Sequence, residues 1–191
     1  MARLILASGS PRRKELMEAL RVPELIVRPA RGEEIVPENA SPDAIVMALA
    51  RQKAAEVFPT AEAGDVVIAA DTIVWMDGLV LGKPHSTEEA FSMLSRLSGR
   101  SHSVFTGVCV MAGDTVLCEA EETKVSFREL SPEEIRSYIA TGEPMDKAGA
   151  YGAQGYASLF VEKLEGDFFN VMGLPLCALG NLLKRLDVSL I

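Results

Sequence analysis

Short apolar runs alternate with strongly marked helix starts along this sequence, and this alternation restricts its fold more than any other feature. Residues 4–7 form an apolar run before Ser10-Pro11, and a second run at 66–70 follows a helical segment that starts at Ser41-Pro42. A serine N-cap with proline at the first helical position is a strong start signal. Because strands that alternate with helices are typical of α/β domains, we expect a mixed twisted sheet flanked by helices.

Further signals of the same kind continue the alternation. Capping-box or proline patterns predict three more helix starts, at Ser86, Ser131 and Pro175. Two-residue turns between apolar runs predict two hairpins, at Asp77-Gly78 and Gly113-Asp114. No internal repeat or linker interrupts these elements. We therefore expect one domain over residues 1–191, built as two lobes around a central cleft.

The Asp-Gly turn of the first hairpin sets its register. Counting outward from the turn pairs Val74 with Leu81 and places Thr72 opposite Lys83. Asp71 directly precedes Thr72 in the sequence. The hairpin is therefore expected to bring a carboxylate and an ammonium group together at its open end.

Composition excludes several classes of partner. The chain has 191 residues, 48% of them hydrophobic, and a net charge of -8. This size supports a buried core, whereas the negative charge repels nucleic acid and anionic lipid. No run approaches the ~18 apolar residues of a membrane span, and the first residues lack a secretory-signal pattern. We expect no nucleic-acid or membrane partner and a cytoplasmic location.

The three cysteines, Cys109, Cys118 and Cys177, form no close pair in the sequence and have no neighbouring histidine. This pattern argues against a disulfide framework and against a zinc site. We therefore expect buried or incidental thiols in a reducing compartment.

The segment 8–13, Ser-Gly-Ser-Pro-Arg-Arg, is the first candidate site. A helix start offers unpaired N–H groups and the positive end of the helix dipole, and Arg12 and Arg13 add bidentate donors for an anion. The Walker spacing is absent here and around Lys83. Two interpretations remain open: a phosphate cradle, and an ordinary capped helix with two surface arginines.

Asp71 and Lys53 are the next candidates. Asp71 follows the most apolar run, where ligands of open α/β sheets bind, and suits a general base, a metal ligand or a turn cap. Lys53 continues an apolar stripe of its helix, so its ammonium group either reaches a solvated edge or enters a cleft. Such cations and a strand-end aspartate, in an acidic chain, point to a polyphosphate ligand.

The remaining candidates give weaker signals. Glu33 and Glu34 either supply oxygen ligands to a hard cation or face solvent. Three glycines between 149 and 155 indicate either backbone in close contact with a ligand or a loop with unusual dihedral angles. His85 and His102 have no relay partner, and we interpret both as structural or exposed.

Taken together, these motifs resemble the Maf family of nucleoside triphosphate pyrophosphatases. The resemblance spans nearly the whole chain and rests on blocks in family order: 4–13, Ala70-Asp71-Thr72, Gly82-Lys83-Pro84, Phe105-Thr106-Gly107, 142–155 and 170–176. It implies a two-lobed Maf/ITPase-like α/β fold. It also implies hydrolysis between the α and β phosphates with a divalent cation, Mg²⁺ or Mn²⁺, and no covalent intermediate. Similar proteins are homodimers.

The resemblance assigns roles to individual residues. Asp71 matches the aspartate that activates water, and the phosphate-binding groups are Ser8, Arg13, Lys53 and Lys83. The metal is expected on Asp71 and Glu34. The segment 28–34 is one residue longer than in similar proteins, and counting back from Lys53 favours Glu34 over Glu33.

Substrate specificity is expected to depend on Arg12, Thr72 and Gln154. Similar proteins that act on dTTP and UTP carry these residue types, whereas the sister group that acts on 7-methyl-GTP has Trp, Gln and Glu. A Gln amide offers a donor and an acceptor to a uracil or thymine edge, whereas Trp stacks on a cationic methylated purine. We expect a house-cleaning enzyme for dTTP, UTP and modified pyrimidine triphosphates. The alternatives are a 7-methyl-GTP pyrophosphatase and a nucleotide-binding regulator of septum formation without turnover.

Overall fold

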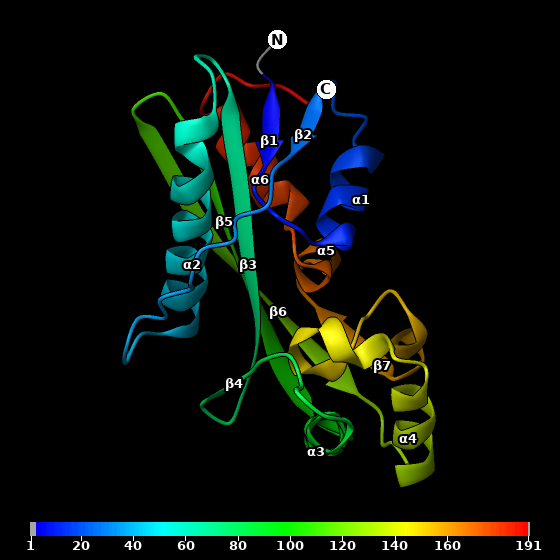
Figure 1. Ribbon diagram of the computed structural model, residues 1–191. Coiled ribbons are helices and arrows are strands. Elements are labelled where there is room, and N and C mark those ends of the chain that lie inside the picture. Colours follow the sequence, from blue (N-terminus) through cyan, green and yellow to red (C-terminus); the bar gives the residue numbers. More distant parts are fainter. Residues whose placement is uncertain (1–2, 191) are drawn as a thin grey trace. The chain divides into compact units, whose positions relative to one another are not determined.

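The structure is a computed structural model, and residues 3–190 are described. Over this range seven strands form one mixed sheet in the order β2-β1-β3-β5-β6-β7, with β4 paired to β3 (Figure 1). The strands are β1 (Leu4–Leu6), β2 (Leu25–Val27), β3 (Val66–Met76), β4 (Leu79–Leu81), β5 (Ser101–Ala112), β6 (Thr115–Phe127) and β7 (Val161–Glu165). The predicted α/β class, with a mixed sheet flanked by helices, is confirmed.

Helices and short 3-10 turns connect these strands. The α-helices are α1 (Pro11–Ala19), α2 (Pro42–Val57), α3 (Thr87–Leu97), α4 (Pro132–Ala140), α5 (Phe168–Met172) and α6 (Leu176–Lys184). The 3-10 turns are η1 (Phe58–Thr60), η2 (Glu143–Asp146), η3 (Ala148–Ala150) and η4 (Tyr156–Leu159). None of the helices formed by residues 3–190 combines the length and the apolar character that a bilayer span requires.

The chain folds into two compact units. Unit 1 comprises Met1–Asp71, Thr106–Glu121 and Gly173–Ile191, and unit 2 comprises Thr72–Phe105 and Glu122–Met172. Strands β3, β5 and β6 are long enough to contribute residues to both.

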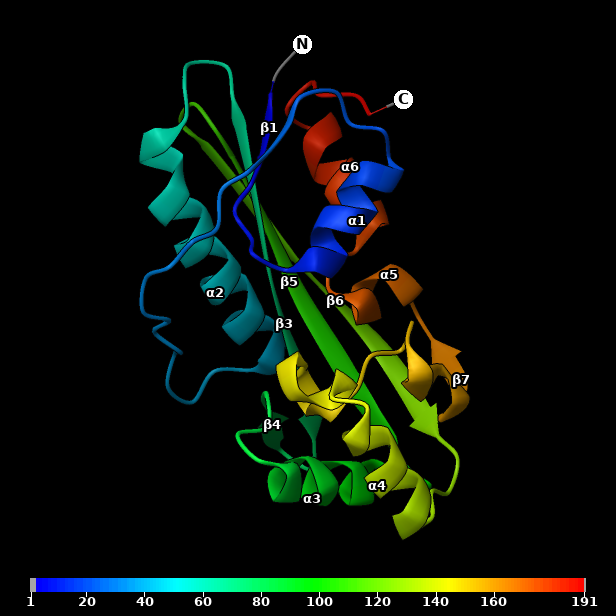
Figure 2. The same cartoon turned by 45° about the vertical axis from the view of Figure 1, so that its right-hand side comes forward.

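Unit 1 covers both faces of its parallel strands with helices. β1 pairs in parallel with β2 on one side and with β3 on the other. Ile5 and Val67 pack against Ala50 and Ala54 of α2, while α1 and α6 lie on the opposite face (Figure 2). Because β1 and the first half of β3 are buried on both faces, these two strands read as continuous apolar runs instead of alternating patterns.

Helix α2 approaches the sheet very closely at Gly107 of β5. A Cβ atom at this position would overlap the carbonyl group of Val46 and lie 2.6 Å from the backbone nitrogen of Met47. Glycine is therefore required so that the helix backbone can pack directly on the strand. This contact fixes the position of α2, the helix that carries Lys53.

The expectation of three free thiols is wrong for two of the cysteines. Cys109 on β5 and Cys118 on β6 form a disulfide, with their Cα atoms 4.1 Å apart. The hairpin turn at Gly113-Asp114 folds β6 back along β5, and counting outward from this turn places Cys109 opposite Cys118. The turn is predicted from the sequence, and its register was the available signal for this disulfide. Cys177 is a free thiol, as expected.

Unit 2 contains the first hairpin, and its predicted register is confirmed. Val74 pairs with Leu81 on β4, and both turn residues, Asp77 and Gly78, have positive φ angles of 52° and 76°. Two positive φ angles are typical of the tight turn that the Asp-Gly step predicts. The paired residues end at Val74, so the placement of Thr72 opposite Lys83 stays a prediction.

The helix starts in unit 2 also follow the predicted capping chemistry. The Ser86 hydroxyl accepts a hydrogen bond from the Glu89 amide at the start of α3. Ser131 and Glu134 form the complete reciprocal capping box at the start of α4. The sequence does not predict β2, β7 or α5, because these elements are only three to five residues long and carry little periodic signal.

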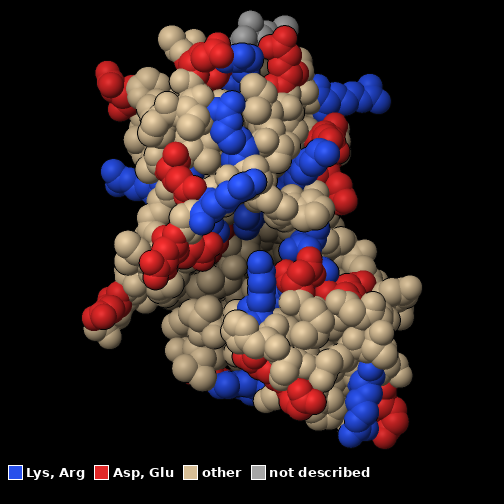
Figure 3. Space-filling view, in the orientation of Figure 1, with Lys and Arg blue, Asp and Glu red and all other residues tan. Residues whose placement is uncertain are grey.

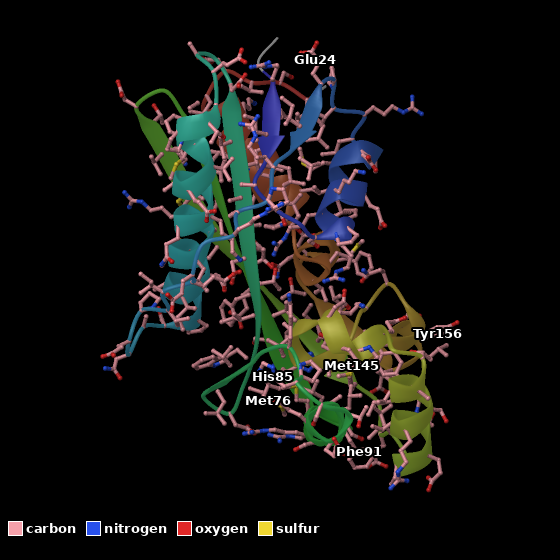
Figure 4. All side chains as sticks on the ribbon, viewed as in Figure 1. Glu24, Met76, His85, Phe91, Met145 and Tyr156 are labelled. Atoms are coloured by element: carbon pink, nitrogen blue, oxygen red, sulfur yellow. A yellow bond between two sulfur atoms is a disulfide. The ribbon has the colours of Figure 1, made fainter. Side chains whose placement is uncertain are left out.

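An aromatic cluster with a buried histidine lies in the core of unit 2. The Nε2 atom of His102 is 2.7 Å from the hydroxyl of Tyr151, and both rings pack edge to face against Phe127. His102 is 3% exposed. Burial lowers its pKa from 6.5 to about 4, which favours the neutral imidazole. The structural interpretation of His102 is thus supported by its surroundings, whereas His85 is exposed (Figure 4).

The contact at Gly107 predicts an asymmetry between two glycine substitutions. Gly107→Ala should lower the free energy of unfolding by about 2 kcal/mol or more, because the methyl group meets helix backbone that cannot move aside. Gly180→Ala is the matched control: that Cβ meets no atom within 4 Å, and alanine in α6 should add about 0.5–1 kcal/mol. Urea denaturation measures both, and equal effects would contradict the backbone contact.

Burial of neutral His102 predicts a loss of stability on mild acidification. The unfolded imidazole takes up a proton below pH 6.5, whereas the folded one does so only near pH 4. Stability therefore falls as pH drops through this window, by about 3 kcal/mol in total. His102→Gln should flatten this part of the stability curve relative to wild type, as measured by urea denaturation at intervals between pH 7 and 4. Parallel curves for the two proteins would exclude His102 as the source.

Candidate active site

The loop between β1 and α1 forms an anion-receptive site in unit 1. The Ser8 side chain is buried, and its Oγ atom accepts hydrogen bonds from the Ser10 amide and from Nη1 of Arg13, each 3.2 Å long. Ser10 is the N-cap of α1, as predicted, yet its side chain does not cap the helix, and the first turn contains no acidic residue. The start of α1 therefore carries neither a Ser10 side-chain cap nor an acidic side chain, and the positive end of the helix dipole there suits an anion.

Arg13 is fixed at this loop by backbone and charge contacts. Its Nε atom donates a 2.6 Å hydrogen bond to the carbonyl oxygen of Gly173. Burial lowers the pKa of the Arg13 guanidinium, the positive charge of Arg12 adds to that effect, and the negative charges of Asp71 and Glu34 oppose it. The cradle and the acidic side chains of unit 1 therefore act on one another electrostatically.

Glu34, Lys53 and Asp71 form a cluster, here called the carboxylate–lysine cluster. The Lys53 Nζ atom lies 2.5 Å from Asp71 Oδ1 and 2.8 Å from Glu34 Oε1. The side chains of Lys53 and Asp71 are 19% and 11% exposed, whereas that of Glu34 is 51% exposed. Lys53 thus turns its ammonium group toward two acids.

Two residues of α2 that sequence reasoning missed hold Glu34 in place. The carboxylate of Glu56 accepts hydrogen bonds from the amides of Arg31 and Gly32, at 2.7 and 2.9 Å. The side-chain amide of Gln52 both accepts from the Ile35 N–H and donates to the Ile35 carbonyl oxygen. Gln52 and Glu56 are spaced i, i+4 on the helix, and that spacing beside Lys53 was the available signal.

The carboxylate–lysine cluster has a donor set that suits a hard divalent cation. Within residues 3–190 no group of three or more His, Cys, Asp or Glu side chains is arranged to hold a metal ion. Asp71 and Glu34 nevertheless direct carboxylate oxygens at the same ammonium group. Mg²⁺ is commonly held by one or two carboxylates together with water and substrate phosphates. The residues therefore fit a cation that arrives with its phosphate ligand.

The structure divides the predicted site residues between the units. Unit 1 contains Ser8, Arg12, Arg13, Glu34, Lys53 and Asp71, and unit 2 contains Thr72, Lys83 and Gln154. Within unit 2, Thr72 is half-buried, and Lys83 and Gln154 are exposed. Within unit 1, Arg13 contacts Ser8, and Lys53 contacts Asp71 and Glu34. The assignment of Thr72, Lys83 and Gln154 to the same site stays a prediction.

The glycine-rich segment has an internal explanation. Gly149 has a φ angle of 68°, and a Cβ atom there would lie 2.8 Å from the Val74 side chain. Cβ atoms at Gly152 and Gly155 would press on the side chains of Lys147 and Glu143. The backbone therefore approaches the side chains of its own unit, and the unusual dihedral angle at Gly149 accords with the second interpretation of this segment.

Charges of both signs are interspersed over the visible face of the molecule (Figure 3). Lys and Arg side chains alternate there with Asp and Glu side chains.

Comparison with known proteins shows the family to which the chain belongs. Residues 3–186 match the family described as Maf-like protein. A protein from Bacillus velezensis named dTTP/UTP pyrophosphatase is 51% identical over 188 residues, covering 98% of each chain. Proteins of the same name from Bacillus cytotoxicus and Caldicellulosiruptor bescii are 50% and 46% identical, covering 98% and 100% of this chain and 97% and 98% of their own.

Solved structures support the fold. The Staphylococcus aureus Ham1 protein superimposes with a TM-score of 0.53 at 14% identity, covering 96% of this chain and 98% of its own. A HAM1 protein from Coxiella burnetii gives 0.52 at 17% identity, covering 97% and 100%. The fold is thus of the Ham1 type, in agreement with the expected ITPase-like architecture. Since the family match and the relatives extend over nearly the whole sequence, the chain belongs to the Maf-like protein family.

Proposed function

We propose that this protein is a nucleoside triphosphate pyrophosphatase that hydrolyses dTTP and UTP to the monophosphate and pyrophosphate. The observation that carries the proposal is the carboxylate–lysine cluster of unit 1, with the Ser8 and Arg13 cradle in the same unit. One ammonium, one guanidinium and the start of α1 offer positive charge for a triphosphate, and Asp71 offers a base. The names of the relatives support the substrate assignment.

In this proposal Asp71 takes the proton from the water molecule that attacks the α phosphorus. The bond between that phosphorus and the bridging oxygen breaks, and pyrophosphate leaves with the additional negative charge. Lys53, Arg13 and the Ser8 hydroxyl stabilise this charge from unit 1. Lys83 of unit 2 is assigned to the same task on the family resemblance.

The carboxylates of Asp71 and Glu34 would hold the divalent cation. Mg²⁺ or Mn²⁺, when bound with the substrate, supplies charge neutralisation at the phosphate oxygens. Lys53 contacts both carboxylates and keeps them at one point before the cation arrives.

Arg12, Thr72 and Gln154 are proposed to select the base. A Gln amide pairs with the donor and acceptor edge that uracil and thymine share. The 7-methyl-GTP alternative lacks support, because position 12 carries Arg instead of Trp, position 72 carries Thr instead of Gln, and position 154 carries Gln instead of Glu. We further propose a cytoplasmic homodimer, since the substrates are cytoplasmic nucleotides and similar proteins are homodimers.

A panel of triphosphates tests this function. With pyrophosphate release as the readout, dTTP and UTP should be cleaved fastest, and size-exclusion chromatography with light scattering should give the mass of a dimer. Fastest cleavage of 7-methyl-GTP would overturn the pyrimidine assignment. Tight nucleotide binding without turnover would instead favour the regulator of septum formation.

Removing the proposed base should abolish turnover without abolishing binding. Asp71→Asn should lower kcat by about 10²–10⁴-fold, the contribution of a positioned general base, and change KM much less. Asp114→Asn is the matched control, since Asp114 lies exposed at the turn between β5 and β6. Undiminished turnover in the Asp71 variant would eliminate its role as base.

The metal assignment predicts different behaviour for two adjacent glutamates. Chelation by EDTA should stop the reaction, and added Mg²⁺ or Mn²⁺ should restore it. Glu34→Gln should raise the Mg²⁺ concentration for half-maximal rate by about tenfold or more, because it removes a charged oxygen ligand. The neighbouring control Glu33→Gln should leave the Mg²⁺ requirement of wild type unchanged. The reverse order would transfer the site to Glu33.

A further inference from the structure

Two side chains of unit 2, Tyr138 and Glu143, here called the polar relay, bind the backbone on both sides of Gln154. The hydroxyl of Tyr138 on α4 donates a 2.8 Å hydrogen bond to Glu143 Oε1 and accepts one of 3.2 Å from the Gly152 amide. Glu143 Oε2 accepts a 3.1 Å hydrogen bond from the Tyr156 amide. Gln154 therefore lies between two amides that are bound by the same pair of side chains.

The relay is anchored in the core of unit 2. Tyr138 is 3% exposed, and its ring packs edge to face on Phe160 with centroids 5.1 Å apart. The Glu143 carbonyl oxygen accepts a 2.7 Å hydrogen bond from Lys147 Nζ. Tyr138 and Glu143 are thus held by Phe160 and Lys147, which lie outside the loop of residues 152–156. The relay can therefore fix the backbone conformation of this loop.

The loop itself is shaped to receive these side chains. A Cβ atom at Gly155 would overlap the Glu143 carboxylate, and one at Gly152 would lie 2.7 Å from Lys147 Cε. A closing hydrogen bond joins the Gly155 amide to the Gly152 carbonyl oxygen at 3.0 Å. Ala153 is buried, whereas Gln154 is exposed, and the Tyr156 ring beyond it is 64% exposed (Figure 4). The tight turn therefore presents Gln154 outward from a fixed backbone.

We propose that Glu143 and Tyr138 are positioning residues that fix the Gln154 loop for recognition of the pyrimidine base. This inference rests on the proposed function and extends it to residues that have no assigned part in phosphate binding or water activation. Selective hydrogen bonding needs an amide whose donor and acceptor are held in one place, because a mobile amide pays an entropic cost on binding. The polar relay fixes the backbone around Gln154 before the substrate binds.

The test is a double-substitution cycle with Glu143→Gln and Gln154→Ala. An amide at 143 no longer offers two acceptor oxygens to Tyr138 and Tyr156, so the loop loosens. Glu143→Gln alone should raise KM for UTP and dTTP by about tenfold with kcat little changed. In the Gln154→Ala background it should add less than twofold, because the group that it positions is already gone.

Three results of the cycle would overturn the proposal. The first is a KM of Glu143→Gln equal to that of wild type. The second is a double variant whose KM increase equals the product of the two single increases. The third is a Glu143→Gln variant in which kcat falls and KM does not change. Glu162→Gln on the exposed edge of β7 is the control for loss of one negative charge and should keep the KM of wild type. Tyr138→Phe keeps the buried ring and removes only the hydroxyl, so it repeats the test in a variant with the same core packing.

A compensating pair tests the contact directly. Gly155→Ala should raise KM for UTP by about tenfold, because its methyl group displaces the Glu143 carboxylate. Combined with Glu143→Ala, which removes the obstructing group, Gly155→Ala should add less than twofold to the effect of Glu143→Ala alone. An equal penalty in both backgrounds would show that the two residues act independently and would exclude the relay.

Hydrogen exchange separates failure of this inference from failure of the proposed function. Exchange of the Gly152 and Tyr156 amides in the full-length protein should accelerate about tenfold or more in Glu143→Gln, whatever nucleotide the wild type cleaves. Absence of UTP and dTTP hydrolysis by wild type would refute the proposed function and, with it, the base-recognition role. Unchanged exchange at both amides would refute the positioning role alone.

Discussion

The ammonium group of Lys53 between the carboxylates of Asp71 and Glu34 is the interaction on which the rest of unit 1 depends. A largely buried lysine is costly unless opposite charges compensate it, and two acids do so here. The same acids repel each other without the cation between them. The lysine therefore compensates both acids at once, and each member of the cluster comes from a different part of the chain.

The fold of unit 1 serves to deliver these three charges. Asp71 is carried by a strand covered on both faces, and Lys53 by a helix whose backbone packs on Gly107. Glu34 lies on a loop, yet Gln52 and Glu56 of the same helix bind the backbone on either side of it. One helix thus positions both the cation and one of its acids, so a shift of α2 would displace both together.

In unit 2, glycines allow side chains to pack closely against the backbone of a loop. Backbone at Gly149, Gly152 and Gly155 approaches neighbouring side chains more closely than any residue with a Cβ atom allows. The loop gains fixed contacts and loses freedom, which suits recognition of a planar base more than chemistry. In the proposed function, the residues of unit 1 supply charge and the base, and those of unit 2 supply ordered hydrogen bonding.

The sequence by itself determined the features that depend on near neighbours: the serine and proline helix starts, the capping box at Ser131, the two hairpin turns and the register at Val74. Only the tertiary structure decided which distant groups meet. The hydrogen bond between Glu143 and the Tyr156 amide carries no periodic signal, and the i, i+4 spacing of Gln52 and Glu56 does not show that they bind the backbone around Glu34. Local signals are read from bonded and i, i+4 geometry, whereas these contacts depend on how packed elements are oriented, which no short window of sequence contains.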